Sequence, residues 1–161
     1  MKIAVLHGPN LDRLGRRRPD KYGTTTLADI EQQINGHAEM HGITVVQTQS
    51  NTEGVLIDWL HDCQDELDGI VVNPAGLTPY GRSLYDALVD TELPVAIVHL
   101  SSFFPYERKT NPAQVCPDLY ADLSSAYIAG FGARGYLLAL ERVIDIAVER
   151  HSDSVKAIPS N

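Results

Sequence analysis

The sequence predicts an α/β fold of three layers, in which a five-stranded parallel sheet lies between helices. Apolar, β-branched segments recur along the chain with helical patterns between them, at residues 3–7, 43–47, 69–73, 95–99 and 127–131. Their hydrophobicity is continuous, as in Ile70, Val71 and Val72, rather than alternating. Continuous hydrophobicity is typical of parallel strands whose two faces are both covered by helices.

Helical patterns separate or follow these strands. The first helix is expected to begin after Thr26, because a threonine side chain can cap the first turn, and to end at Gly42. The expected helical ranges are 26–42, about 53–63, about 82–89 and about 135–146. Right-handed crossovers through such helices leave few sheet topologies.

Length and composition fit one globular domain. The chain has 161 residues, of which 43% are hydrophobic and 21% are charged, which is enough for a full core. Residues 149–161 are polar, include Pro159 and show no period, so this segment is expected to fray. We therefore expect a single domain over residues 1–148 and a polar C-terminal tail over residues 149–161.

Charge and hydropathy exclude several kinds of partner. The net charge of −8 argues against nucleic-acid binding, and the arginine run at 16–18 is too short to reverse it. An apolar run of about 18 residues is absent, and the chain enters its first strand without a leader. These features predict a cytoplasmic protein with neither a nucleic-acid nor a membrane partner.

Neither a metal nor a cofactor is expected. Cys63 and Cys116 lie far apart without a CxxC motif and are interpreted as free structural thiols. The run at 130–135 matches GxGxxG, but too little chain follows it for a dinucleotide site, so we interpret it as a tight turn. Four histidines on helix faces or in the tail are expected to be solvated: His37, His41, His61 and His151.

The loop after the first strand, residues 7–23, has the composition of a lid over an active site. It carries Asn10, three consecutive arginines and Tyr22. The Arg17 guanidinium, if it lies close to Tyr22, can lower the pKa of the phenol by about 1 to 3 units from its ordinary value near 10. A tyrosinate base is one interpretation of this loop, and a solvated loop is the other.

Polar side chains also follow the other strands. In open parallel sheets, ligands bind at the carboxyl ends of the strands, near the point where the strand order reverses. The strand ends carry His7 and Asn10, Gln49 to Asn51, Asn73, and His99 with Ser101. Each alone is explained by an Asx-turn or a cap, but together they indicate a small polar ligand. His99 is either a packed core residue or a proton donor.

With these residues in place, the sequence resembles the type II dehydroquinases over about residues 3–140. The motifs that carry the resemblance are GPNLDRLGRRRPDKYG, QSNTEGVLIDWLHD, NPAGLT, VHLS and GFGARGYLLALE. The resemblance implies a hydro-lyase that removes water from 3-dehydroquinate by trans-elimination through an enolate, in the shikimate or quinate pathway. It also implies a flavodoxin-like fold, no cofactor and a homo-oligomer, a dodecamer of trimers.

The resemblance assigns roles by position. Tyr22 would remove the proton next to the ketone, Arg17 would keep Tyr22 ionised, and His99 would protonate the departing hydroxyl. Asn10 would hold a water on the enolate oxygen. The carboxylate of the substrate would be bound by Asn73 and the backbone N–H groups of Leu100 and Ser101. Asp86, which comes from a neighbouring subunit in the family, is kept.

The sequence departs from the family where the ring hydroxyls are bound. Pro79 stands in place of a histidine, Ile97 in place of a glutamate, and residues 103–117 form a longer segment in place of an arginine-rich one. Arg108 or Lys109 would substitute there. Two alternatives stay open: a divergent dehydratase for another β-hydroxy ketone acid, and a non-catalytic ligand-binding member.

Overall fold

The protein is a five-stranded parallel sheet between two pairs of helices. The computed structural model describes residues 1–16, 23–102 and 118–156. The strands are β1 (Lys2–His7), β2 (Thr44–Gln49), β3 (Gly69–Asn73), β4 (Val95–His99) and β5 (Ala126–Ala129). All pairs are parallel, in the order β2-β1-β3-β4-β5. The predicted three-layer α/β class is therefore confirmed, and this order is the flavodoxin-like one.

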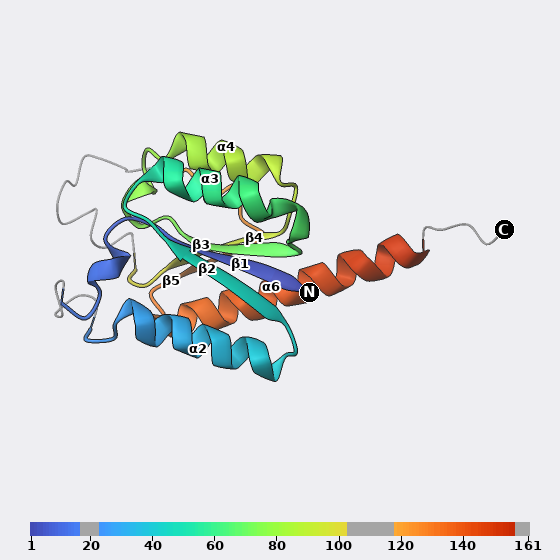
Figure 1. Ribbon diagram of the computed structural model, residues 1–161, viewed down its shortest axis with the longest axis horizontal. Coiled ribbons are helices and arrows are strands. Elements are labelled where there is room, and N and C mark those ends of the chain that lie inside the picture. Colours follow the sequence, from blue (N-terminus) through green and yellow to red (C-terminus); the bar gives the residue numbers. More distant parts are fainter. Residues whose placement is uncertain (17–22, 103–117, 157–161) are drawn as a thin grey trace.

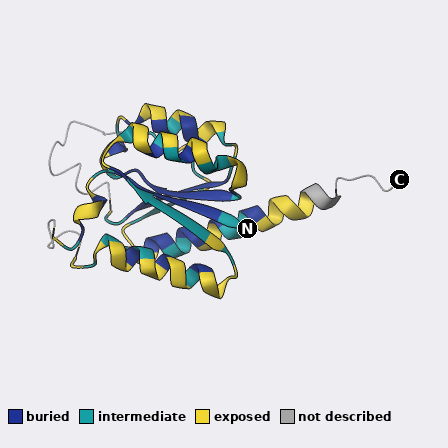
Figure 2. Ribbon diagram, viewed as in Figure 1, coloured by how far each residue is buried: buried dark blue, intermediate teal, exposed yellow. Residues whose placement is uncertain are grey.

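The helices cover both faces of the sheet (Figure 1). Their bounds are α2 (Leu27–Met40), α3 (Glu53–Cys63), α4 (Arg82–Asp90) and α6 (Arg134–Lys156), with short 3-10 turns η1 (Leu11–Arg13), η2 (Gln64–Glu66) and η3 (Ala75–Leu77). The α2 and α6 helices pack on one face, and α3 and α4 pack on the other. Strands β3 and β4 are buried along their whole length (Figure 2), which is why their hydrophobicity is continuous.

The first helix begins where the sequence predicts. The Thr26 side chain accepts the Asp29 N–H at 3.1 Å, and the Asp29 carboxylate accepts the Thr26 N–H at 2.9 Å. This capping box satisfies two N–H groups of the first turn. The hydrogen bonds from Thr26 also hold the pKa of Asp29 below its usual value.

Two expected boundaries are wrong. Helix α6 continues to Lys156, so the predicted fraying after Val148 does not hold for residues 149–156. The last strand is Ala126–Ala129 rather than 127–131, because Gly130 has a φ of 89° and turns the chain out of the sheet. The division into a domain over 1–148 and a tail remains a prediction. Within the described residues, no helix is long and apolar enough to span a membrane.

His7 is fully buried at the carboxyl end of β1. Its side chain is fully enclosed; Nδ1 lies 2.9 Å from the Tyr136 hydroxyl and Nε2 lies 3.4 Å from Oε1 of Gln47. Desolvation lowers the pKa of His7 to about 4 although the Gln47 hydrogen bond opposes this shift. His7 is therefore neutral at pH 7 and joins β1 to α6.

The buried His7 predicts a loss of stability in mild acid. Below about pH 6.5 the unfolded chain takes up a proton on this residue, and the folded chain does not do so until about pH 4. From pH 7 to pH 4.5 this contribution should lower the free energy of unfolding by about 2 to 3 kcal/mol. Urea unfolding at both pH values measures it. The decrease should be smaller in His7→Gln than in His61→Gln, which changes an exposed histidine; equal decreases in the two variants would contradict the assignment.

Candidate active site

The carboxyl ends of the strands meet at one edge of the sheet. His7 is in register with Gln49 of β2 on one side and with Asn73 of β3 on the other. The chain order reverses at this point, since β2 lies on one side of β1 and β3 on the other. An open parallel sheet forms its ligand crevice at such a position. The strand ends that the sequence singled out are therefore neighbours.

β1 and β3 are joined closely beyond their last pair. The Gly8 N–H donates to the Asn73 carbonyl at 2.8 Å, and a Cβ on Gly8 would overlap the carbonyl oxygen of Pro74. Asn73 is 2% exposed, and its Oδ1 accepts the Ala75 N–H at 3.1 Å. Asn73 thus forms the Asx-turn that was one interpretation of the strand-end residues, and the acceptor in this turn is its side-chain oxygen Oδ1.

Asn10 lies on the exposed side of the same edge. It adopts a left-handed conformation, with a φ of 67°, just before η1. Its backbone N–H donates to Oδ1 of Asn51 at 2.6 Å, while Nε2 of Gln49 donates to the Gly8 carbonyl at 3.3 Å. These bonds hold the start of the loop after β1 against the end of β2, and the Asn10 side chain is exposed at the strand ends.

His99 is paired with an acidic residue that the sequence did not indicate. Its Nε2 lies 2.9 Å from Oδ2 of Asp118, and the Tyr127 hydroxyl donates to the same oxygen at 2.6 Å. His99 is 7% exposed, so water screens the pair little. Of the two interpretations of His99, a packed core residue or a proton donor, the carboxylate partner favours the second, because a histidine that only packs in the core needs no carboxylate.

The Asp118 carboxylate is ionised in this network. Burial alone would raise its pKa, but hydrogen bonds from His99, Tyr127 and the Tyr120 N–H hold the pKa of Asp118 below its usual value. A carboxylate that accepts one ring N–H of a histidine fixes the orientation of the ring and stabilises its protonated form. The His99 ring is therefore fixed in one orientation at the carboxyl end of β4.

Asp118 is held in place by its neighbours in the chain. The Leu119 N–H donates to the Thr78 carbonyl at 3.1 Å, and the Tyr120 hydroxyl donates to the Gly81 carbonyl at 2.7 Å. Tyr120 is fully buried, which also raises the pKa of its phenol well above the ordinary value. A Cβ on Gly81 would lie 2.5 Å from the Tyr120 hydroxyl, so this anchor requires a glycine.

A sequence signal for Asp118 exists in retrospect. Side chains alternate along a strand, so residues 97 and 99 of β4 share a face. Ile97 is fully buried on that face, and Tyr127 is its register partner on β5. Because position 97 holds no acidic side chain, an acidic neighbour of His99 has to come from another part of the chain. Asp118 directly follows residues 103–117, the segment that is longer than expected.

The other predicted site residues fall into two groups. Leu100 and Ser101 directly follow β4 and are half-buried, and the Leu100 carbonyl accepts the Gly132 N–H at 2.9 Å. Asp86 lies exposed on α4 and pairs with Arg82 at 2.9 Å, four residues earlier. The remaining four lie outside the described residues: Arg17, Tyr22, Arg108 and Lys109.

One expected feature of the histidines is wrong. His37 is not solvated, because its side chain is only 12% exposed between α2 and α6. His37 forms the only group of metal-ligating side chains found in the described part of the chain, together with His41 and Glu141, and this group does not include the strand-end residues. The glycine run at 130–135 forms the turn into α6, with positive φ at Gly130 and Gly132, as the sequence predicts.

Known proteins resemble this chain over nearly its whole length. The family model described as dehydroquinase class II matches residues 1–144. A 3-dehydroquinate dehydratase from Roseiflexus castenholzii is 44% identical over 88% of this chain and 87% of its own. One from Halothermothrix orenii is 42% identical over 90% and 95%. The crystal structure of the type II dehydroquinase from Propionibacterium acnes aligns with a TM-score of 0.76, at 33% identity, over 91% and 96%.

The close approach of β1 and β3 predicts that Gly8 cannot carry a side chain. Gly8→Ala should lower the free energy of unfolding by about 2 kcal/mol, because the fixed Pro74 carbonyl cannot move away cheaply. Gly36→Ala is the matched control: this exposed glycine inside α2 has open space around its Cβ position. That variant should be stabilised by about 0.5 to 1 kcal/mol. Denaturant unfolding compares the two, and a Gly8→Ala protein as stable as the parent would contradict the prediction.

Proposed function

Because the chain belongs to the class II dehydroquinase family, we propose how its own residues carry out the reaction of that family. The protein is a 3-dehydroquinate dehydratase, a hydro-lyase that converts 3-dehydroquinate to 3-dehydroshikimate and water in the shikimate pathway. The observation that carries the residue assignment is the pair of His99 and Asp118 at the carboxyl end of β4, in which Nε2 of His99 lies 2.9 Å from Oδ2 of Asp118.

The first step is removal of a proton from the carbon next to the ketone. Tyr22, as a phenolate kept ionised by Arg17, takes this proton. The electrons of the broken C–H bond form a double bond to the carbonyl carbon, and the π electrons of the carbonyl move onto the ketone oxygen to give an enolate. Asn10 holds a water that donates a hydrogen bond to that oxygen and stabilises the charge. The Asn10 side chain is exposed beside the β1 and β2 ends, where a ligand in the crevice reaches it.

The second step expels the hydroxyl group as water. The enolate electrons return to form the carbon–carbon double bond, the carbon–oxygen bond breaks, and His99 gives its proton to the departing oxygen. Asp118 stabilises the protonated His99 until this transfer, and Tyr127 holds the carboxylate from the other side. Asp118 thus positions His99 in place of an acidic residue at position 97.

The carboxylate of the substrate binds between β3 and β4. The Asx-turn occupies Oδ1 of the Asn73 amide, and the same amide is hydrogen-bonded to Tyr136, so its nitrogen offers the remaining hydrogen to the carboxylate. The backbone N–H groups of Leu100 and Ser101 supply further donors next to it on the β4 end. Arg108 or Lys109 reads the distal ring hydroxyls from the segment that replaces the arginine-rich one of the family.

Further features of the family complete the proposal. The chain assembles as a dodecamer of trimers in the cytoplasm, where it can serve aromatic amino acid synthesis or quinate catabolism. Asp86 reaches the site of a neighbouring subunit, and its exposed position on α4 supports this assignment.

The proposed base is tested by turnover. Purified protein mixed with 3-dehydroquinate should produce the ultraviolet absorbance of the conjugated enone. Tyr22→Phe should lower kcat by about 10³-fold or more while binding persists, since the phenyl ring keeps its shape but cannot accept a proton. Arg17→Ala should lower kcat as well. A Tyr22→Phe protein with parental kcat would refute the assignment, and a parent that binds but never turns over would favour the non-catalytic alternative.

The role of Asp118 is tested by Asp118→Asn. Without the carboxylate partner the ring is no longer held in the orientation for proton transfer, so kcat should fall by about 10²-fold with little change in KM. Asp122→Asn is the matched control, because Asp122 is exposed nearby in sequence. A fall in kcat that is accompanied by a rise in KM and a lower Tm would indicate only a structural role.

A further inference from the structure

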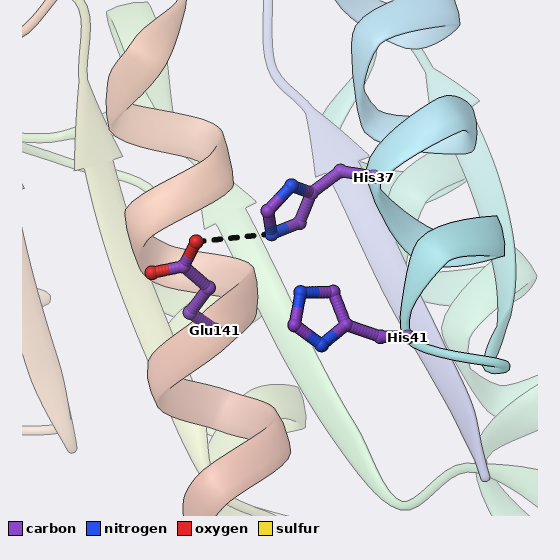
Figure 3. Close-up of side chains that lie close together, drawn as sticks. All are labelled: His37, His41 and Glu141. Carbon is purple, nitrogen blue, oxygen red and sulfur yellow. Dashed lines mark ion pairs between the residues drawn. The ribbon is translucent and has the colours of Figure 1, made fainter.

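A second cluster of chemically capable side chains lies between α2 and α6. His37 and His41 are four residues apart at the C-terminal end of α2, so they share one face of the helix. Glu141 faces them from α6 (Figure 3). One ligand atom from each of the three residues lies within 4.8 Å of the others.

The geometry of His37 is not that of a hydrogen bond. Its Nε2 lies 3.1 Å from Oε1 of Glu141. The same atom is buried and makes no hydrogen bond within the described part of the chain, so the carboxylate stands close to the ring nitrogen without accepting from it. Two ligands of one tetrahedral zinc ion, at about 2.0 to 2.2 Å from the metal, lie about 3.3 to 3.5 Å apart. The observed separation is near that value.

The donor set selects one class of cation. Two imidazoles and one carboxylate are typical ligands of Zn²⁺ and of neighbouring transition metals, whereas Mg²⁺ and Ca²⁺ require oxygen ligands. The last turn of a helix carries partial negative charge, and both histidines lie there, so a cation at this position is favoured. The net charge of −8 acts in the same direction.

We propose that His37, His41 and Glu141 bind one divalent transition-metal ion of the zinc class, which joins α2 to α6. Three protein ligands leave a fourth position, and the exposure of His41 and Glu141 opens it to water. Because the three ligand atoms are spread over as much as 4.8 Å, the proposal requires the exposed His41 side chain to move toward the other two when the ion binds.

The location makes this site structural rather than catalytic. After α2 the chain turns, and the Thr44 N–H donates to the Met1 carbonyl at 3.0 Å, so the end of α2 lies beside the beginning of β1. The dehydratase residues lie at the opposite ends of the strands. The metal would therefore stabilise the packing of two helices and take no part in the elimination of water.

The first experiment is a titration of tag-free, metal-stripped protein with ZnCl₂ by calorimetry, with thermal unfolding in parallel. We expect one Zn²⁺ per chain and a higher Tm in its presence. His41→Ala and Glu141→Gln, both at exposed positions that the fold tolerates, should each weaken binding by at least about tenfold. His61→Ala, which removes an exposed histidine from α3, should bind like the parent.

Cobalt gives an independent readout of coordination. Co²⁺ should produce the intense visible bands of a tetrahedral site in the parent and in His61→Ala, and not in His41→Ala. If His41→Ala loses Zn²⁺ binding while Glu141→Gln keeps it, the ion is held by a surface histidine pair and the three-ligand site is refuted. Absence of Zn²⁺ binding in the parent would refute the site as well. Dehydratase turnover should be the same with and without bound Zn²⁺. Turnover and Zn²⁺ binding are measured independently, so a failure of the metal-site proposal can be distinguished from a failure of the proposed function.

Discussion

The hydrogen bond from Gly8 to the Asn73 carbonyl joins the two strands at which the strand order reverses. β1 and β3 approach here so closely that Gly8 has no room for a side chain. The loop after β1, with Asn10, and the Asx-turn after β3 are both fixed by this contact. At the end of β1, His7 stays neutral because it is enclosed, so the contact between β1 and β3 holds no buried charge on this residue.

The sequence predicted the parts of the fold that depend on local chemistry. Thr26 and Asp29 cap α2 through their own side chains, and β3 and β4 are apolar because helices cover both faces. The end of α6 was missed, since polar residues beyond the sheet form helix without an apolar stripe. Asp118 was missed for a different reason: its partner His99 is 19 residues away, and only the folded chain brings the two together.

Contacts link the segment before α4 to the surroundings of His99. The Gly81 carbonyl accepts the Tyr120 hydroxyl. Tyr120 and Leu119 hold Asp118 beside His99. Ile97, two residues before His99, is fully buried in the hydrophobic core and offers no acidic group to the ring. The acidic neighbour of His99 therefore comes from residue 118 and not from strand β4 itself.

These contacts have a consequence for substitutions at a distance from His99. A side chain at position 81 would meet the Tyr120 hydroxyl, and the neighbouring Asp118 is the residue that pairs with His99. Positions 81 and 118 are therefore coupled through Tyr120, and a substitution at Gly81 changes the surroundings of a histidine with which it shares no direct hydrogen bond.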